Sequence, residues 1–267
     1  MYTNFDGMIS PLEIAALVAG GFAAGLINTL AGNGSAITLP LLMSFGMDAN
    51  AANATNRVGA LFQTISAMGS LPKTQRTRYL IRESRFIVLP IVLGSIGGAF
   101  LAIDLPENIL RLAIGFVMIV LLLTLLLNPK KWLIATDGSK RRKTPLVWLS
   151  FFALGVYGGF IQIGFGIFFL SLGVLMAKYA LRDANIMKLF LALIMTVPAF
   201  AIFAFGGAIE WIPGLSLAAG TSLGARFGTR KVITHPKANA VTRYVLIGVI
   251  LIAIVKMFQP YITALIF

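Results

Sequence analysis

The sequence predicts an all-α polytopic membrane protein made of two inverted-topology repeats, each a broken helical hairpin followed by three transmembrane helices. Three observations lead to this prediction. Hydrophobic residues make up 58% of the 267 residues and charged residues 12%, with a mean hydropathy of +0.90. Two long apolar stretches are each interrupted by a pair of glycines, and the basic residues gather in short segments between the apolar runs. Several runs approach the roughly 20 residues that a helix needs to cross a bilayer.

The composition excludes several classes of site. The chain has no cysteine and a single histidine, His235, which lies in a basic segment. Disulfides, thiolate metal sites and thiol catalysis are therefore excluded, and so are a multi-histidine metal site and a buried Ser/His/Asp triad. We expect no catalytic residue, no metal and no cofactor, and we predict that the protein is not an enzyme. The N-terminus has no signal-peptide pattern, so we expect the residues from Leu12 onward to belong to the mature fold.

The basic residues predict the topology. Lys and Arg number 22 against 9 for Asp and Glu, a net charge of +13, which in a soluble protein would suggest nucleic acid binding. Here they form four clusters in short loops, which stay in the cytoplasm, so we place these clusters inside and exclude nucleic acid as a partner. Acidic residues such as Glu107 and Glu210 then fall outside. The clusters are Lys73, Arg76, Arg78, Arg82, Arg85; Lys130, Lys131, Lys140, Arg141, Arg142, Lys143; Lys178, Arg182, Lys188; and Arg226, Arg230, Lys231, Lys237, Arg243.

The two interrupted stretches each return to the face from which they start. The stretch from Leu12 to Met47 contains Gly32-Asn33-Gly34 and starts and ends outside. The stretch from Leu146 to Ala177 contains Gly164-Phe165-Gly166 and lies between two cytoplasmic clusters. Each is expected to be a hairpin, or a span plus a re-entrant arm, and the two enter from opposite faces, as in an inverted repeat. Both chain termini are predicted outside.

These assignments divide the chain into two repeats. Repeat one is predicted over residues 1–128, with its hairpin at 12–47 and helices at 51–71, 86–103 and 109–127. A basic cytoplasmic linker, 129–144, leads to repeat two over 145–267, with its hairpin at 146–177 and helices at 186–205, 212–227 and 244–261.

Internal matches support a duplication. A shift of 132 residues places Gly32 on Gly164, Gly34 on Gly166 and Asn56 on Lys188. A second match pairs Gly94, Gly98 and Ala99 with Gly220, Gly224 and Ala225. Small residues at this spacing let helices approach closely in lipid, so we take the second match as evidence for the fold rather than for a site.

The glycine breaks predict where a substrate binds. A helix interrupted in the membrane exposes N–H groups and a partial positive charge, and both favour an anion. Irregular backbone at this depth is tolerated only inside protein or beside a water-filled cavity. The helix starts at Ser35 and Ile167 should therefore face a pocket, although tight packing alone is the competing explanation.

Polar residues near the breaks are the candidate ligands. Amides and hydroxyls can donate hydrogen bonds to an anion without the cost of burying further charge, while Arg57 offers a planar fork suited to an oxyanion. Lys188 is its inner counterpart; for both, snorkelling to a headgroup is the competing explanation. The predicted substrate-binding residues are Asn28, Thr29, Gly32, Asn33, Gly34, Ser35, Asn53, Asn56, Arg57, Gln162, Gly164, Phe165, Gly166 and Lys188.

The order of these motifs resembles a known family. Gly32-x-Gly34 followed by Leu39-Pro40-Leu41-Leu42, then Ala52-x-Ala54-Thr55-Asn56, and Gly94 to Ala99 with its echo at Gly220 to Gly228, are similar to the TauE/SafE sulfite exporter family of bacterial permeases. The resemblance covers nearly the whole chain. It implies secondary transport of a sulfur-containing anion, such as sulfite or an organosulfonate, across the bacterial inner membrane. The chain departs from the family pattern at Asn33, Phe165 and Met187-Lys188, which bears on the substrate more than on the fold.

The sequence leaves several alternatives open. A passive anion channel and a carrier for a non-sulfur carboxylate fit the same pattern, and a homodimer is compatible with it. No acidic residue is predicted deep in a span, so none is an obvious proton carrier. A sodium ion held by backbone carbonyls at the breaks and an uncoupled carrier are equally open, as is the direction of transport.

Overall fold

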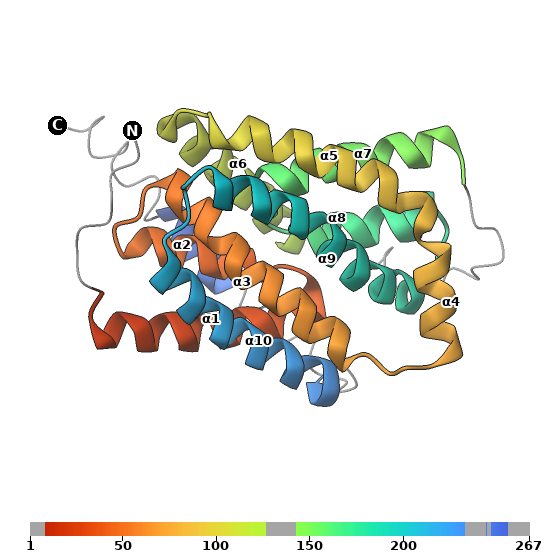
Figure 1. Ribbon diagram of the computed structural model, residues 1–267, viewed down its shortest axis with the longest axis horizontal. Coiled ribbons are helices and arrows are strands. Elements are labelled where there is room, and N and C mark those ends of the chain that lie inside the picture. Colours follow the sequence, from red (N-terminus) through yellow and green to blue (C-terminus); the bar gives the residue numbers. More distant parts are fainter. Residues whose placement is uncertain (1–8, 127–142, 233–243, 245–246, 256–267) are drawn as a thin grey trace.

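The protein is a helical bundle, seen in a computed structural model that describes residues 9–126, 143–232, 244 and 247–255 (Figure 1). Over these residues the regular structure is entirely helical. Within the described part of the chain, four helices are long and apolar enough to cross a membrane: Pro11–Thr29, Arg85–Ile103, Glu107–Leu126 and Leu181–Phe205. The prediction of an all-α polytopic membrane protein is thus confirmed. The linker expected at 129–144 and the helix expected at 244–261 lie largely outside the described residues, as does His235.

The first apolar stretch is two helices separated at the glycines. Helix α1 spans Pro11–Ala31 and starts with a capping box in which the Ser10 and Glu13 side chains each accept a backbone N–H of the other residue. It ends at Gly32, whose φ of +75° is a left-handed conformation that glycine adopts without strain. Helix α2 spans Ser35–Ser44 and turns back along the bundle in Figure 1.

The second apolar stretch is broken in the same way. Helix α7 spans Pro145–Phe160, and α8 covers Phe165–Ser171 and continues as a π-helical turn over Leu172–Met176. Between them, both Gln162 and Gly164 have a positive φ, of 65° and 67°. A glutamine rarely adopts this conformation, so its surroundings must hold it there.

The two breaks touch each other through their backbones. The Gly166 N–H donates a 3.1 Å hydrogen bond to the Gly32 carbonyl oxygen. A Cβ on either glycine would collide with the backbone of the other, so neither position has room for a side chain. Segments far apart in the sequence are therefore joined at one point inside the bundle.

The remaining helices surround this point. Helix α3 spans Ala49–Ser70. It is unusually polar for a membrane protein, because its buried residues include Asn53, Thr55, Asn56 and Arg57, and such groups avoid lipid by facing protein. The other helices are α4 Gln75–Glu83, α5 Arg85–Ile103, α6 Glu107–Leu126, α9 Leu181–Phe205 and α10 Trp211–Phe227, followed by a π-helical turn over Gly228–Val232 and a helical segment at 247–255.

Two features of these helices differ from the expected elements. The basic segment after α3 contains the short helix α4, in which Thr74 caps the first turn and Leu80 is buried. Helix α9 starts at Leu181 rather than at the expected 186. Asp183 in its first turn is a favourable residue at the positive end of a helix, which explains the earlier start.

The most extensive helix contacts join α1 to α10 and α5 to α7. In both pairs, glycines lie directly against the backbone of the partner helix. The residue numbers of the contacting positions increase in the same direction on both helices, so the paired helices run parallel. This is the close approach that small residues allow in membranes. The positions are Gly220 at Val18, Gly224 at Phe22, Gly94 at Phe152 and Gly98 at Val156.

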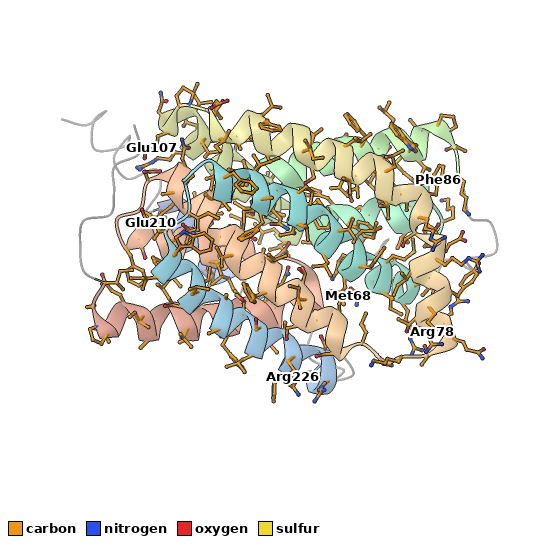
Figure 2. All side chains as sticks on the ribbon, in the orientation of Figure 1. Met68, Arg78, Phe86, Glu107, Glu210 and Arg226 are labelled. Atoms are coloured by element: carbon orange, nitrogen blue, oxygen red, sulfur yellow. The ribbon has the colours of Figure 1, made fainter. Side chains whose placement is uncertain are left out.

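Some acidic and basic residues lie toward opposite ends of the bundle. Figure 2 shows Glu107 and Glu210 at one end and Arg78 at the other. Glu210 precedes the first residue of α10 and Arg226 lies in its last turn, so this helix also runs from the acidic end toward a basic one.

The glycine contacts lead to a stability prediction. Replacing Gly98 by alanine places a methyl group on the Val156 carbonyl, and we expect the free energy of unfolding to fall by about 1–3 kcal/mol. Gly97→Ala is the matched control, because nothing lies within 4 Å of its added Cβ. Thermal unfolding of the two variants in detergent measures the difference, and equal melting temperatures would contradict the close packing of α5 on α7.

Candidate functional site

A small cavity lies beside the point where the two breaks meet. Its volume is about 30 Å³, which is room for only one or two water molecules, so a larger solute does not fit in this conformation. Residues from both breaks, from α3 and from α9 line it: Asn28, Gly32, Ser35, Ala60, Gln63, Thr64, Gln162, Phe165, Gly166, Lys188, Leu189 and Ala192.

A chain of hydrogen bonds that starts at the first break fixes the orientation of two amide side chains, those of Asn28 and Gln63, which line the cavity. The Gly34 N–H can only donate, and it donates to Asn28 Oδ1 at 3.1 Å. The Asn28 amide nitrogen therefore donates in turn to Gln63 Oε1, at 2.6 Å. The Gln63 amide nitrogen is left buried, with no hydrogen-bond partner among the described residues. On this side of the cavity, the polar group left without a partner is therefore a hydrogen-bond donor, the Gln63 amide nitrogen.

The second break is oriented by Arg57 in the same manner. One guanidinium N–H donates to Gln162 Oε1 at 3.0 Å, so the Gln162 amide nitrogen donates to Thr196 Oγ1 at 2.8 Å. The Thr196 hydroxyl donates in turn to the Ala192 carbonyl at 2.7 Å. These bonds hold Gln162 in its left-handed conformation and occupy its oxygen, which is then not free to repel an anion.

Lys188 supplies the positive charge of the cavity. It lies about two turns inside α9 and is 2% exposed, and its Nζ has no hydrogen-bond partner among the described residues. The residues that line the cavity include no acid. An ammonium group held in this way is costly unless an anion pairs with it.

The nearest acid on α9 is already paired. Asp183 accepts two hydrogen bonds from the Arg76 guanidinium of α4. The hydrogen bonds and negative charge of Asp183 raise the pKa of Arg76 above its ordinary value. This pair links α4 to α9 outside the cavity.

Arg57 lies behind the second break rather than in the cavity lining. Its guanidinium is completely buried, sits 5.2 Å from the centre of the Phe203 ring, and donates to the Gly158 and Gly159 carbonyls of α7 at 2.6 and 2.8 Å. Carbonyls at a helix C-terminus carry partial negative charge, which a cation stabilises. With the bond to Gln162 and a longer one of 3.5 Å to Asn53, only Nε has no partner among the described residues.

The structure divides the predicted site residues into two sets. Those lining the cavity are Asn28, Gly32, Ser35, Gln162, Phe165, Gly166 and Lys188. Those outside the lining are Thr29, Asn33, Gly34, Asn53, Asn56, Gly164 and Arg57.

Several residues of the second set have structural contacts. The Thr29 hydroxyl donates to the Gly25 carbonyl at 2.9 Å, and the Asn53 amide donates to the Phe160 carbonyl at 2.8 Å. Asn56 accepts from Thr38 at 2.5 Å and donates to the Ser35 hydroxyl at 3.1 Å. Asn33 is buried, and neither polar atom of its amide has a partner in the described part of the chain.

The N-terminal N–H groups of the half-helices are partly occupied within the protein. The Gly34 N–H binds Asn28, and the Phe165 and Gly166 N–H groups bind the Gln162 and Gly32 carbonyls. In this conformation, the donors left for a ligand are therefore mainly side chains.

Two polar residues of the lining, Gln63 and Thr64, are absent from the sequence prediction. Gln63 lies two turns after Asn56 on α3, and residues seven positions apart share a helix face. A polar stripe continuing from Asn56 into the middle of a span was the signal that could have identified it.

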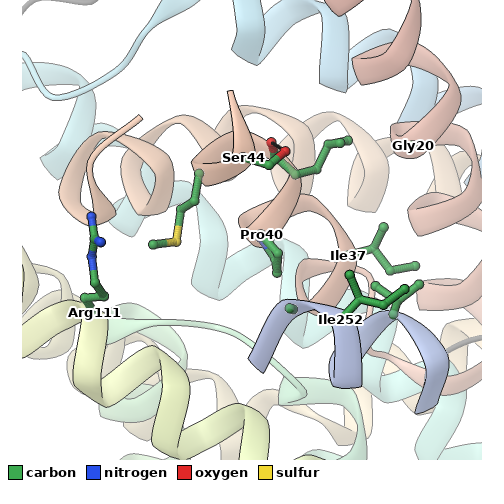
Figure 3. Close-up of a pocket in the computed structure, with 10 residues that line it drawn as sticks. Gly20, Ile37, Pro40, Ser44, Arg111 and Ile252 are labelled. Atoms are coloured by element: carbon green, nitrogen blue, oxygen red, sulfur yellow. Dashed lines mark hydrogen bonds between the residues drawn. The ribbon is translucent and has the colours of Figure 1, made fainter. Parts of the chain in front are cut away.

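A larger groove lies on the side of the bundle (Figure 3). Its volume is about 570 Å³, and mostly apolar side chains of α2 and of the segment 247–255 line it, with Arg111 at one end. Arg111 donates to Glu107 at 2.6 Å, so its charge is already paired. Such a groove suits a lipid acyl chain better than a small anion.

Long apolar helices, two buried breaks and a polar cavity between them define a membrane transport protein, since transporters place substrate sites at discontinuous helices. Comparison with known proteins identifies the family: a model described as sulfite exporter TauE/SafE matches residues 17–257. The chain belongs to this family.

Named relatives agree with this class. The chain is 31% identical over 219 residues to a probable membrane transporter protein, ORF9, of Sinorhizobium sp., covering 81% of this chain and 82% of the relative. It is 28% identical over 229 residues to the probable membrane transporter protein YfcA of Escherichia coli K12, covering 85% and 83%. A probable membrane transporter protein of Haemophilus influenzae is 31% identical over 229 residues, covering 84% and 87%. No solved structure matches the chain.

The contacts of Arg57 lead to a prediction that separates anchoring from binding. Arg57→Lys removes the planar guanidinium that donates to two α7 carbonyls at once, so we expect the free energy of unfolding to fall by about 2 kcal/mol or more. The further stabilisation produced by a bound anion should remain. Thermal unfolding with and without added sulfonate measures both quantities.

Arg111→Lys is the control, because an exposed pair with Glu107 is expected to contribute less than about 1 kcal/mol. If Arg57→Lys instead kept full stability and lost the response to anion, the guanidinium would be a direct ligand, as the sequence alone suggests.

Proposed function

We propose that the protein is a secondary transporter that moves a small sulfur-containing anion, an organosulfonate or sulfite, across the bacterial cytoplasmic membrane. The observation that carries the proposal is the buried, unpartnered Nζ of Lys188, a residue that lines a cavity with no acid among its described lining residues. The Gln63 amide nitrogen adds a second unpartnered donor. A cation and an oriented donor in a buried, uncharged surrounding form a site for an oxyanion.

Alternating access follows from where the cavity lies. In this conformation it is too small for an organosulfonate, and parts of both broken segments line it, so admitting a substrate requires the segments to move relative to their surroundings. The pairing of α1 with α10 and of α5 with α7 supports two inverted repeats, 1–128 and 145–267, because each pair would contain one helix from each repeat. Rocking of one repeat against the other around a fixed site is the common mechanism in such folds.

The orientation in the membrane rests on the charges. With the Arg-rich ends inside, as short basic loops require, the first hairpin enters from outside and the second from the cytoplasm. Both termini then lie outside. The polar groups of the cavity lining serve binding, and the protein is a carrier rather than an enzyme.

The sulfur chemistry of the substrate rests on the family. The matching family is described as sulfite exporters, and a sulfonate presents three oxygens to the donors of Lys188 and Gln63. A thermal-shift series with sulfite, taurine, sulfoacetate, aryl sulfonates and matched carboxylates tests this class. Stabilisation by carboxylates alone would assign the carrier to non-sulfur anions.

Counterflow in proteoliposomes tests the transport mechanism. Labelled sulfonate should accumulate when unlabelled sulfonate is trapped inside, because a carrier exchanges one for the other. An ohmic current without exchange would identify a passive channel instead.

Lys188 is the residue whose replacement should abolish binding without unfolding the protein. We expect Lys188→Gln to weaken sulfonate binding about 10- to 100-fold, since a hydrogen bond to a charged group is lost. The melting temperature without anion should stay the same or rise, because a buried amine without a hydrogen-bond partner is removed.

Arg182→Gln is the matched control: it removes a cation from an exposed position of the same helix and should leave binding unchanged. Binding that survives in Lys188→Gln would place the anion elsewhere.

A further inference from the structure

Lys188 raises a question of charge that anion binding alone does not answer. The residue is 2% exposed, and its Nζ has no partner among the described residues. When the cavity is empty, an ammonium there would be held without a counter-charge, which is costly. The cost disappears in two ways: the amine gives up its proton, or an anion enters beside it.

We infer that proton and anion bind together at Lys188, so that one proton crosses the membrane with each monoanion. The inference rests on the proposed function and names the coupling ion of that same site. The empty cavity holds a neutral amine, and the loaded cavity holds an ammonium paired with the anion.

The other residues that line the cavity with Lys188 are uncharged. From the first break they are Asn28 and Ser35, from α3 Gln63 and Thr64, and from the second break Gln162, together with backbone and apolar side chains. None of these side chains exchanges a proton near neutral pH. Among the described lining residues, Lys188 is therefore the group that can carry a proton.

Charged and titratable groups further away already have partners. The Arg57 guanidinium binds the α7 carbonyls, and the Tyr157 hydroxyl of α7 donates to the Ile163 carbonyl. Asp183 is bound by Arg76 of α4. The carboxylate of Asp183, on the same helix as Lys188, is thus already paired with Arg76, which leaves the anion as the counter-charge of the Lys188 ammonium.

The cycle balances in atoms and charge. The amine lone pair takes a proton from water on the face to which the cavity is open, and the resulting ammonium pairs with the entering monoanion. After reorientation the anion leaves, and the N–H bond gives its proton back to water on the other face. Both the empty and the loaded carrier are neutral in the cavity, so net transport follows the pH gradient and the anion gradient rather than the membrane potential.

The same balance predicts a preference for singly charged anions. A dianion paired with one ammonium leaves a net negative charge in the cavity, which burial penalises. Methanesulfonate should therefore be carried at least about tenfold faster than sulfate, although both present sulfur-bound oxygens to the same donors.

Proton movement in proteoliposomes tests the coupling. Methanesulfonate is the probe, because it stays ionised at neutral pH and carries no proton of its own. With a pH dye trapped inside, an inward methanesulfonate gradient should acidify the lumen by one proton per labelled anion. Setting the potential with potassium and valinomycin should not change the initial rate.

Lys188→Arg separates anion exchange from proton transfer. A guanidinium keeps its proton, so the variant should still exchange methanesulfonate but should lose the acidification, and its net uptake should become sensitive to the potential. Lys188→Gln should lose both activities, and Arg182→Gln should keep both. Acidification that persists in Lys188→Arg overturns the inference.

A binding measurement on the unaltered protein covers the case in which Lys188→Arg does not fold. In weakly buffered detergent solution, methanesulfonate binding should take up one proton per anion, and at alkaline pH the dissociation constant should rise about tenfold per pH unit. Binding and exchange without proton uptake would overturn the coupling and leave the proposed function intact. Absence of binding and exchange for every sulfonate would overturn the proposed function itself.

Discussion

Backbone that a helix break leaves unpaired at membrane depth must find its partners in protein, because lipid offers none. In this protein the two breaks pair with each other: the Gly166 N–H donates to the Gly32 carbonyl, and neither glycine has room for a side chain. The rest of the structure depends on this contact. It brings α1, α2, α7 and α8 to one point, and it leaves a cavity beside that point which α3 and α9 close.

The polarity of the cavity depends on two groups that can donate hydrogen bonds but cannot accept them. A backbone N–H at Gly34 and the guanidinium of Arg57 each fix one end of a short hydrogen-bond chain, and the amide oxygens are used up along it. An amide whose oxygen is occupied can offer only its nitrogen to a ligand. Arg57 thus affects the site without lining it: it orients Gln162 and binds the carbonyls at the negative end of α7.

The fold was predictable because its signals are local. Apolar length identifies spans, glycines at Gly32 and Gly164 permit left-handed turns, and small residues such as Gly98 and Gly224 mark close helix contacts. Helix α4 was missed because its basic residues are equally typical of a cytoplasmic loop, and it depends on the tertiary burial of Leu80. The site was harder to predict. An arginine within a span signals a constraint, but whether Arg57 meets a substrate or the carbonyls of α7, a hundred residues away, depends on tertiary packing that the sequence does not display. The inverted repeat and the direction of the termini remain predictions from charge and internal similarity.

The internal match also shows why a site between similar halves need not be symmetric. The shift that aligns the two breaks places Asn56 of α3 on Lys188 of α9. Asn56 is fully engaged, accepting from Thr38 and donating to Ser35, and so it supports the start of α2. Lys188 has no such partner in the described part of the chain and faces the cavity instead. In the predicted inverted repeat these two positions are equivalent, and one difference of residue gives the first a structural role and the second the charge that pairs with the proposed substrate.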